Sequence, residues 1–235
     1  MSTAINLFDI YRSPNIGIFL KANDKFTLVP RGLAPSKIEK LSELLQNNPV
    51  QISIAGSRLI GPLVAMNNHG ILVSRLADDE EIETLSKLTQ MHVEKLDSRF
   101  TSVGNLVSAN DNGAIASDIF NDESINTIQR VLEVPVKKMR ISTYVQLGAM
   151  VSATNNGSLV HPVANEQELE SIRKTLRIDP EPATVNGGIP FVSSGFVGNT
   201  NSVLLGNLTR GGELVIIGRA FEDGKHSINS NQDLK

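Results

Sequence analysis

Histidine and cysteine, two side chains that often act in catalysis or hold metal ions, are scarce in this sequence. The 235 residues include four histidines and no cysteine. A thiolate nucleophile, a disulfide and a cysteine metal site are therefore excluded. His69, His92, His161 and His226 each lack a second ligand at the spacing of a metal site. We expect no metal and no cofactor.

Two other short motifs have simpler explanations than a ligand site. The acidic run 78–83 leads into apolar residues at helical spacing, so we expect the solvated start of a helix rather than a cation site. Gly211 and Gly212 lack the Lys and Ser/Thr that complete a phosphate-binding loop. Residue counts do not exclude a serine nucleophile, but the sequence shows no nucleophile-elbow pattern.

The charge balance argues against nucleic acid as the main ligand. The net charge is −3, whereas proteins that bind phosphates directly usually carry an excess of Lys and Arg. The N-terminus does not resemble a signal peptide, and no apolar run approaches the roughly 20 residues of a membrane span. We expect a cytoplasmic protein that does not bind membranes.

The clearest pattern is an internal repeat of about 44 residues. The glycines that mark it are spaced 44, 43, 44 and 47 residues apart, and they are Gly17, Gly61, Gly104, Gly148 and Gly195. A polar residue stands six positions after each of them, in order Asn23, Asn67, Asn110, Thr154 and Asn201. This regularity predicts five copies of one structural unit.

Each copy predicts a hairpin, a helix and a further strand. The hairpin tips are expected at 67–70, 110–113 and 155–157, where Asn and Gly tolerate the positive φ of tight turns. Apolar residues recur at helical spacing within 38–45, 82–88, 125–132, 169–176 and 214–221. Extended runs follow the first four helices at 50–54, 92–96, 136–141 and 183–186.

The two ends of the chain complement each other. The opening run 5–11 supplies the strand that would otherwise be missing after the fifth helix. One such unit is too small to bury both of its faces, whereas five in a closed ring bury a common centre and leave no sheet edge free. We therefore expect one α+β domain over residues 1–222, built as a closed ring, and a frayed tail over 223–235.

Over residues 5–222 the chain resembles the translation initiation factor 6 family, the ribosome anti-association factors of archaea and eukaryotes. The stretches that carry the resemblance occur in the family's order, at 53–56, 60–61, 68–73, 102–105, 109–111, 159–162 and 184–186. The resemblance implies a pentein fold, a five-fold pseudosymmetric α/β propeller. It also implies binding to the intersubunit face of the large ribosomal subunit.

In this family the main partner is a ribosomal protein on that face, with ribosomal RNA nearby. The bound factor blocks the small subunit, and a role in large-subunit maturation is also implied. The resemblance points to a monomer without a small-molecule substrate. Family members contact the ribosome around the repeat glycines, and the matching positions are Gly17, Asn67, Gly104 and Asn105. Three further positions depart from the eukaryotic Arg, Tyr and Val, namely Pro62, Met150 and Phe191.

For the repeat glycines themselves, a structural explanation is sufficient: a close backbone approach at the centre that a Cβ would obstruct. Asn105 is different, because it is polar where the other copies carry apolar residues. These counterparts are Ile18, Pro62, Ala149 and Phe196. We therefore expect Asn105 to contact the partner.

Two other function classes are less consistent with the sequence. Some pentein relatives are guanidine-modifying enzymes, whose chemistry places a Cys nucleophile beside a His and carboxylates. The absence of cysteine excludes that thiol-dependent chemistry. A free-standing oligomeric scaffold is not supported by any feature of the sequence. We expect a binding protein rather than an enzyme.

Overall fold

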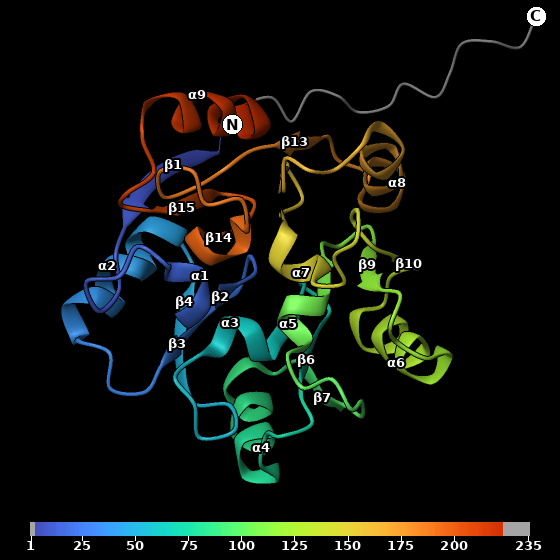
Figure 1. The fold of residues 1–235 in the computed structure, drawn as a ribbon. Coiled ribbons are helices and arrows are strands. Elements are labelled where there is room, and N and C mark those ends of the chain that lie inside the picture. The colour runs from blue at the N-terminus through green and yellow to red at the C-terminus, as the bar shows by residue number, and fades with distance from the viewer. Residues whose placement is uncertain (1–2, 223–235) are drawn as a thin grey trace, which may run out of the picture.

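The computed structural model describes residues 3–222, so the tail expected at 223–235 lies outside the described residues. The architecture is α+β, with five small sheets of three strands each (Figure 1). Within this part of the chain, no helix is long and apolar enough to cross a membrane.

Five units share one order of elements: a one-turn helix, an inner strand, a middle strand, a long helix and an outer strand. The one-turn helices are α1 (Ile16–Phe19), α3 (Ile60–Leu63), α5 (Val103–Leu106), α7 (Leu147–Met150) and the 3₁₀ turn η1 (Val192–Gly195). The inner strands are β2 (Lys21–Ala22), β5 (Val64–Met66), β8 (Val107–Ala109), β11 (Val151–Ala153) and β14 (Phe196–Gly198).

The remaining three element types complete each unit. The middle strands are β3 (Phe26–Pro30), β6 (Gly70–Ser74), β9 (Ala114–Ser117), β12 (Ser158–Val160) and β15 (Ser202–Gly206). The long helices are α2 (Pro35–Leu45), α4 (Asp79–Thr89), α6 (Asp122–Leu132), α8 (Glu166–Leu176) and α9 (Gly211–Glu222). The outer strands are β4 (Asn48–Ile52), β7 (His92–Leu96), β10 (Val136–Met139), β13 (Pro180–Pro182) and, for the fifth unit, β1 (Ala4–Phe8).

In every sheet the middle strand lies at the centre, antiparallel to the inner strand and parallel to the outer strand. The fifth sheet combines both ends of the described chain, because β1 pairs with β15 in parallel from Ala4↔Ser202 to Phe8↔Gly206. The prediction that the opening run completes the last unit is confirmed.

The long helices lie where the apolar periodicity predicts them, and their first turns explain why. Asp78 and Glu81 form a capping box at the start of α4, and Asn165 and Glu168 do the same for α8. The acidic run 78–83 is therefore the beginning of a helix, as expected. Each of the first four long helices ends at a residue with positive φ, in order Gln46, Gln90, Glu133 and Arg177.

Each long helix packs between its own sheet and the sheet of the preceding unit. Ile128 of α6 shares a core cluster with Leu72 of β6, and Ile217 of α9 shares one with Leu159 of β12. The first helix follows the same rule, since Leu41 of α2 packs with Leu204 of β15 in the fifth unit. Each apolar core is therefore built by two neighbouring units.

One strand prediction is wrong. The extended run expected at 183–186 is a loop with a bridge between Val185 and Ile189, and the strand of this unit is Pro180–Pro182. Two prolines hide the strand, because proline cannot donate a ladder hydrogen bond and counts against a strand in a sequence pattern. They are tolerated here because β13 is an outer strand.

The hairpin tips lie where predicted, but their glycines have a different role from the one expected. Gly70, Gly113 and Gly157 are absent from the described residues with positive φ. A Cβ on Gly70 would instead overlap the carbonyl oxygen of Val131 in the next unit. Gly113 and Gly157 meet the carbonyl oxygens of Thr175 and Ala220 in the same way. These glycines permit close packing between units rather than a turn.

The close contact at Gly70 predicts that Gly70→Ala lowers the free energy of unfolding by about 2–3 kcal/mol, because the added methyl group must displace the backbone of Val131. Gly212→Ala is the matched control: no atom lies within 4 Å of the Cβ position and φ is not positive. The control should be neutral or stabilising by up to about 1 kcal/mol, since alanine favours the helix. Urea unfolding of both variants checks this, and equal midpoints would contradict the steric explanation.

Candidate functional site

The one-turn helices stand side by side around the centre of the molecule (Figure 1). Each contacts two others, in the order α1, α3, α5, α7, η1 and back to α1. A Cβ on Gly61 would overlap the carbonyl oxygen of Gly17, and one on Gly104 would overlap that of Gly61. The structural explanation of these repeat glycines is confirmed.

The fifth repeat is anchored two residues earlier than predicted. Ser193 is the second residue of η1, as Gly17 is of α1, and the carbonyl oxygen of Ser193 is the one that a Cβ on Gly17 would meet. The hydroxyl of Ser193 donates to the carbonyl oxygen of Gly148 at 2.6 Å. Gly195 is therefore not the counterpart of the other four glycines. At this position the fifth unit has a hydrogen bond from the serine hydroxyl, whereas the other units have a close backbone contact at glycine.

Asn105 has a polar counterpart in the fifth unit. Its counterpart in the fifth unit is Ser194, not Phe196, so Asn105 is not the only polar residue at this position. The backbone N–H of Asn105 donates to Ser102 O at 3.0 Å, and its side chain makes no hydrogen bond with the described residues. Asn105 is half-buried and lines the central cavity. Its amide therefore has free hydrogen-bonding capacity at that cavity.

The asparagine series, six residues beyond each anchor, is Asn23, Asn67, Asn110, Thr154 and Asn199. The side-chain amide of Asn23 donates to Asn67 O at 2.8 Å, and that of Asn67 donates to Asn110 O at 3.1 Å. Asn110 donates to Thr154 O at 3.1 Å, and Asn199 donates to Asn23 O at 3.5 Å. The side-chain oxygens stabilise the hairpin tips, as when Asn67 Oδ1 accepts from the N–H of Gly70 at 3.1 Å.

The predicted site residues lie in three different places. Five of them, Gly17, Pro62, Gly104, Asn105 and Phe191, line one central cavity of about 220 Å³. Asn67 instead lines a second cavity of about 30 Å³, together with the rest of the asparagine series. Met150 is fully buried in the core of the fourth unit. The structure therefore brings five predicted residues together and places Asn67 and Met150 away from them.

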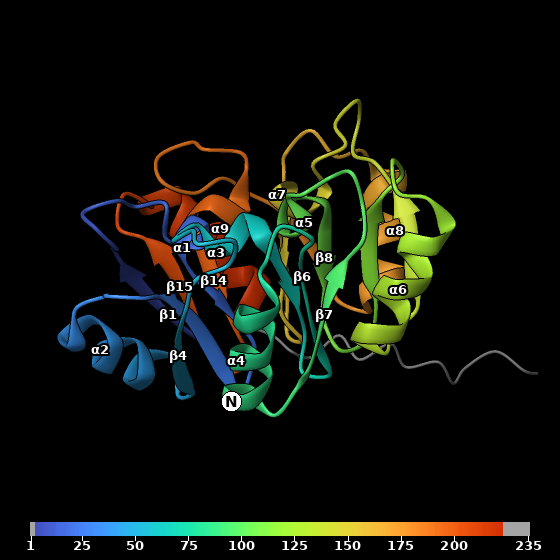
Figure 2. The same ribbon diagram turned by 90° about the horizontal axis from the view of Figure 1, so that it is seen from below.

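Loops that precede the one-turn helices form what we call the loop end of the molecule. Figure 2 shows these loops rising on the side of α1, α3, α5 and α7. Four loops carry an exposed large apolar side chain: Tyr11 is 43% exposed, Leu59 45%, Tyr144 40% and Ile189 42%. None of the four was predicted. They stand six, two, four and four positions before Gly17, Gly61, Gly148 and Ser193, so the repeat spacing alone does not identify them.

All four of these loops hold left-handed backbone, at Ser142 and at 186–188 as well as in the first two loops. Tyr11 and Arg12 have φ of 53° and 59°, and Ala55 and Gly56 have φ of 56° and 65°. Glycine adopts this conformation without penalty, whereas other residues are strained by about 1–3 kcal/mol each. A tyrosine and an arginine at such positions, both exposed, indicate that their side chains serve a purpose other than stability.

The third residue of a long helix supports the loop in several units. Glu81 of α4 accepts from Ala55 N at 2.6 Å and from Gly56 N at 3.0 Å. Glu213 of α9 accepts from Gly187 N at 3.0 Å and from Gly188 N at 2.8 Å. Burial alone would raise the pKa of Glu81, but the donated backbone hydrogen bonds outweigh it and the pKa is lowered. These carboxylates remain ionised and hold the loops rigidly.

Cationic and aromatic side chains share the loop end. The guanidinium of Arg58 lies 5.9 Å from the ring centroid of Tyr11. Phe191, at the cavity, packs against Tyr144 and His161 with centroid distances of 6.0 and 5.3 Å. Burial lowers the pKa of His161, which favours a neutral ring inside this cluster. Arginine and aromatic residues are enriched in protein interfaces.

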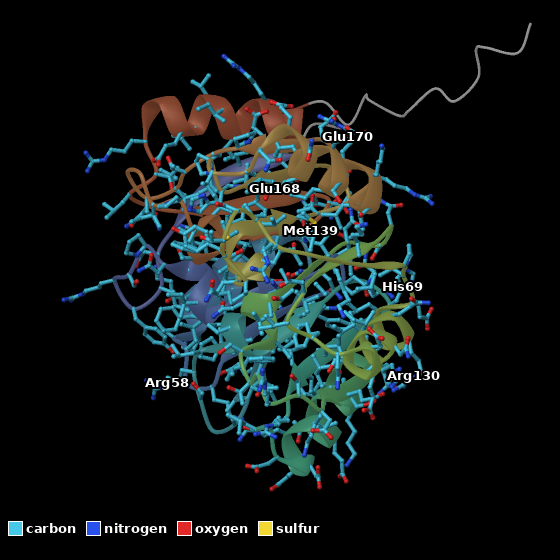
Figure 3. All side chains as sticks on the ribbon, turned by 45° about the vertical axis from the view of Figure 1, so that its right-hand side comes forward. Arg58, His69, Arg130, Met139, Glu168 and Glu170 are labelled. Carbon is cyan, nitrogen blue, oxygen red and sulfur yellow. The ribbon has the colours of Figure 1, made fainter. Side chains whose placement is uncertain are left out.

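Figure 3 shows Arg58 on one side of the molecule, with His69 and Arg130 on the other. His69 belongs to the turn that follows Asn67, and its side chain lies 3.9 Å from the carboxylates of Asp111 and Glu133. His69 thus takes part in a contact between units. Exposed apolar side chains also occur on the long helices, at Leu88 of α4 and Val215 of α9, but the four loop residues stand close to the one-turn helices.

Comparison with known proteins agrees with the resemblance found in the sequence. The eIF-6 family model matches residues 5–220. Translation initiation factor 6 of Cenarchaeum symbiosum is 43% identical over 214 residues, which cover 91% of this chain and 97% of the relative. The Nitrosopumilus maritimus protein is 42% identical with the same coverage, and that of Sulfolobus acidocaldarius is 34% identical over 221 residues, 93% of this chain and 99% of the relative.

The site geometry predicts a structural role for Asn67. Asn67→Ala removes two buried donors, to Asn110 O and Leu132 O, and the acceptor of the hairpin tip. We expect the free energy of unfolding to fall by about 3 kcal/mol. Asn126→Ala, at an exposed position of α6, should change it by less than about 0.5 kcal/mol. Chemical unfolding measures both, and a native-like Asn67→Ala variant would refute the assignment.

Proposed function

The chain belongs to the eIF-6 family of translation initiation factors, and from this premise we propose that its loop end binds the intersubunit face of the large ribosomal subunit. The observation that carries the proposal is the gathering of exposed apolar side chains on the loops around the central cavity. A surface rimmed by Tyr11, Leu59, Tyr144 and Ile189 is typical of a protein-binding face.

We also infer that the five units form one domain, closed as the ring of a pentein fold. The contact between η1 and α1, the packing of α2 on β15 and the bond from Asn199 to Asn23 support this inference. A closed ring gives the loop end a rigid base. Rigid surfaces bind with a smaller loss of conformational entropy than mobile ones.

Steric exclusion is the mechanism that fits this surface. A body of this size on the intersubunit face prevents the small subunit from docking there, so affinity alone sets the effect and no bond is made or broken. A standard interface of ~1,600 Å² supplies enough affinity for such a role. The main partner is then a ribosomal protein, consistent with a net charge of −3, with ribosomal RNA as a neighbour.

We assign the contacts to the residues around the cavity mouth and to the loops. Pro62, Asn105 and Phe191 contribute side chains there. Gly17 and Gly104 keep the one-turn helices close together. Asn67 and Met150 support the binding face from within rather than touch the partner. The guanidine-modifying alternative requires thiol chemistry, and the sequence lacks the cysteine for it. We expect a cytoplasmic monomer.

The proposal predicts that Asn105→Arg weakens binding to purified large subunits at least tenfold, because a bulky cation replaces a small amide at the cavity mouth. Asn126→Arg on α6 introduces the same side chain at an exposed position away from the loops and should bind normally. Sucrose-gradient co-sedimentation measures both, along with the fraction of joined ribosomes. Unchanged binding by Asn105→Arg would remove this residue from the interface, and absence of any co-sedimentation would end the proposal.

A second prediction separates stability from binding at the strained loop. Replacing Tyr11 and Arg12 by Asn and Gly relieves two left-handed residues, so we expect the free energy of unfolding to rise by about 1 kcal/mol or more. The same double substitution removes an aromatic and a cationic side chain and should weaken large-subunit binding. Thermal unfolding and co-sedimentation test the two effects together. A stabilised protein with full affinity would show that this loop is not a contact.

A further inference from the structure

The central cavity contains a single ionisable side chain, that of Lys21. The five inner strands surround the cavity, each contacting the next, from β2 through β5, β8, β11 and β14 back to β2. Lys21 stands four residues beyond the anchor of its unit, and the same position in the other units is occupied by Ala65, Ser108, Ser152 and Val197. Of these five residues, all but Ala65 line the cavity.

Nothing in the described residues neutralises the charge of this lysine. The residues that line the cavity include no Asp and no Glu. No carboxylate of the described chain lies within 4 Å of the Lys21 ammonium, and the ammonium donates no hydrogen bond to it. By contrast, Lys37 pairs with Asp9 at 3.0 Å and Lys95 pairs with Asp79 at 2.6 Å. An unpaired cation inside a protein is unfavourable.

The surroundings of Lys21 combine burial with access to water. Burial lowers the pKa of the ammonium to about 8, yet the residue is only partly buried by surface area. Both observations fit a side chain inside the molecule that faces a hollow large enough for several waters. The cavity volume of about 220 Å³ compares with about 30 Å³ for one water. Near pH 7 the larger fraction of Lys21 is still protonated.

Two counterparts of Lys21 in other units, Ser108 and Ser152, carry hydroxyl groups, which are a second type of hydrogen-bond donor. Ser152 Oγ lies 2.8 Å from Ser193 Oγ, and Ser193 is positioned to give its proton to Gly148 O at 2.6 Å. Ser152 then donates to Ser193 and has no proton for a ligand. Ser108 is buried, and its hydroxyl makes no hydrogen bond with the described residues. The free donors at this position are thus Lys21 and Ser108.

We propose that the central cavity is a binding site for one small monovalent anion of the size of chloride, held by the ammonium of Lys21, with the hydroxyl of Ser108 as a free donor elsewhere in the lining. A single anion neutralises the single positive charge of the Lys21 ammonium, which no carboxylate of the described residues does. The ion enters between the one-turn helices, where Pro62, Asn105 and Ala149 line the cavity. This inference does not depend on ribosome binding.

Chloride can be tested on the intact protein by thermal unfolding at pH 7 and constant ionic strength, with chloride replacing the bulky anion gluconate. A ligand that binds only the folded state raises the unfolding temperature in a saturable way. We expect this rise in the unaltered protein and in Lys40→Met, whose lysine is exposed. Lys21→Met should not respond to chloride. An equal response of Lys21→Met would overturn the proposal.

A second measurement needs no variant. Nuclear magnetic resonance of isotope-labelled lysines follows the titration of the Lys21 ammonium at several chloride concentrations. A bound anion favours the charged form, so the pKa should rise from about 8 as chloride increases. A pKa independent of chloride would mean that the cavity holds water alone, and the proposal would fail even if Lys21→Met did not fold.

Discussion

The structure depends on the close approach of five backbone segments at the centre of the molecule. A side chain at the second residue of α3 or α5 would overlap the carbonyl oxygen of the preceding one-turn helix, so glycine is required there. At the hairpin tips, hydrogen bonds join the units instead: the side-chain amides of the asparagine series donate to backbone carbonyl oxygens of the next unit. Neither interaction exists within one unit. A unit of three strands and a helix cannot bury both faces alone, so each becomes stable only beside its neighbours.

A centre held in this way explains how the loop end tolerates strain. Left-handed residues such as Tyr11 and Arg12 relax to ordinary conformations unless the flanking backbone is fixed. Here the bridge between Ile10 and Ser13 closes the loop on itself. The one-turn helix that follows is wedged between two others. In other units the third residue of a long helix adds a carboxylate under the loop, as Glu81 and Glu213 do. The same contacts that assemble the units therefore position the surface proposed to bind.

Much of this fold could be predicted because local chemistry and global packing agree. Capping residues and apolar spacing define the long helices, and the run 92–96 is a strand as predicted. The misses arise where a residue type has another physical use. Ser193 replaces the fifth glycine because its hydroxyl bonds to Gly148 O, and a glycine count therefore selects Gly195. Prolines conceal the strand β13. The contact role that the resemblance implies for Asn67 stays a prediction, and its internal hydrogen bonds are the reason we propose a structural role instead.

Comparison among the five units shows where symmetry is kept and where it is lost. The asparagine series keeps its residue type in four of five copies, because each copy makes the same contact with its neighbour. Around the cavity the equivalent residues differ between units. No other unit has a lysine at the position of Lys21, and three of the four counterparts of Asn105 are apolar. The contacts that recur between units do not account for these differences. Binding of a ligand or partner that lacks five-fold symmetry would account for them. The departures from the repeat therefore support the proposed binding at the cavity and the loop end, whereas the asparagine series serves assembly.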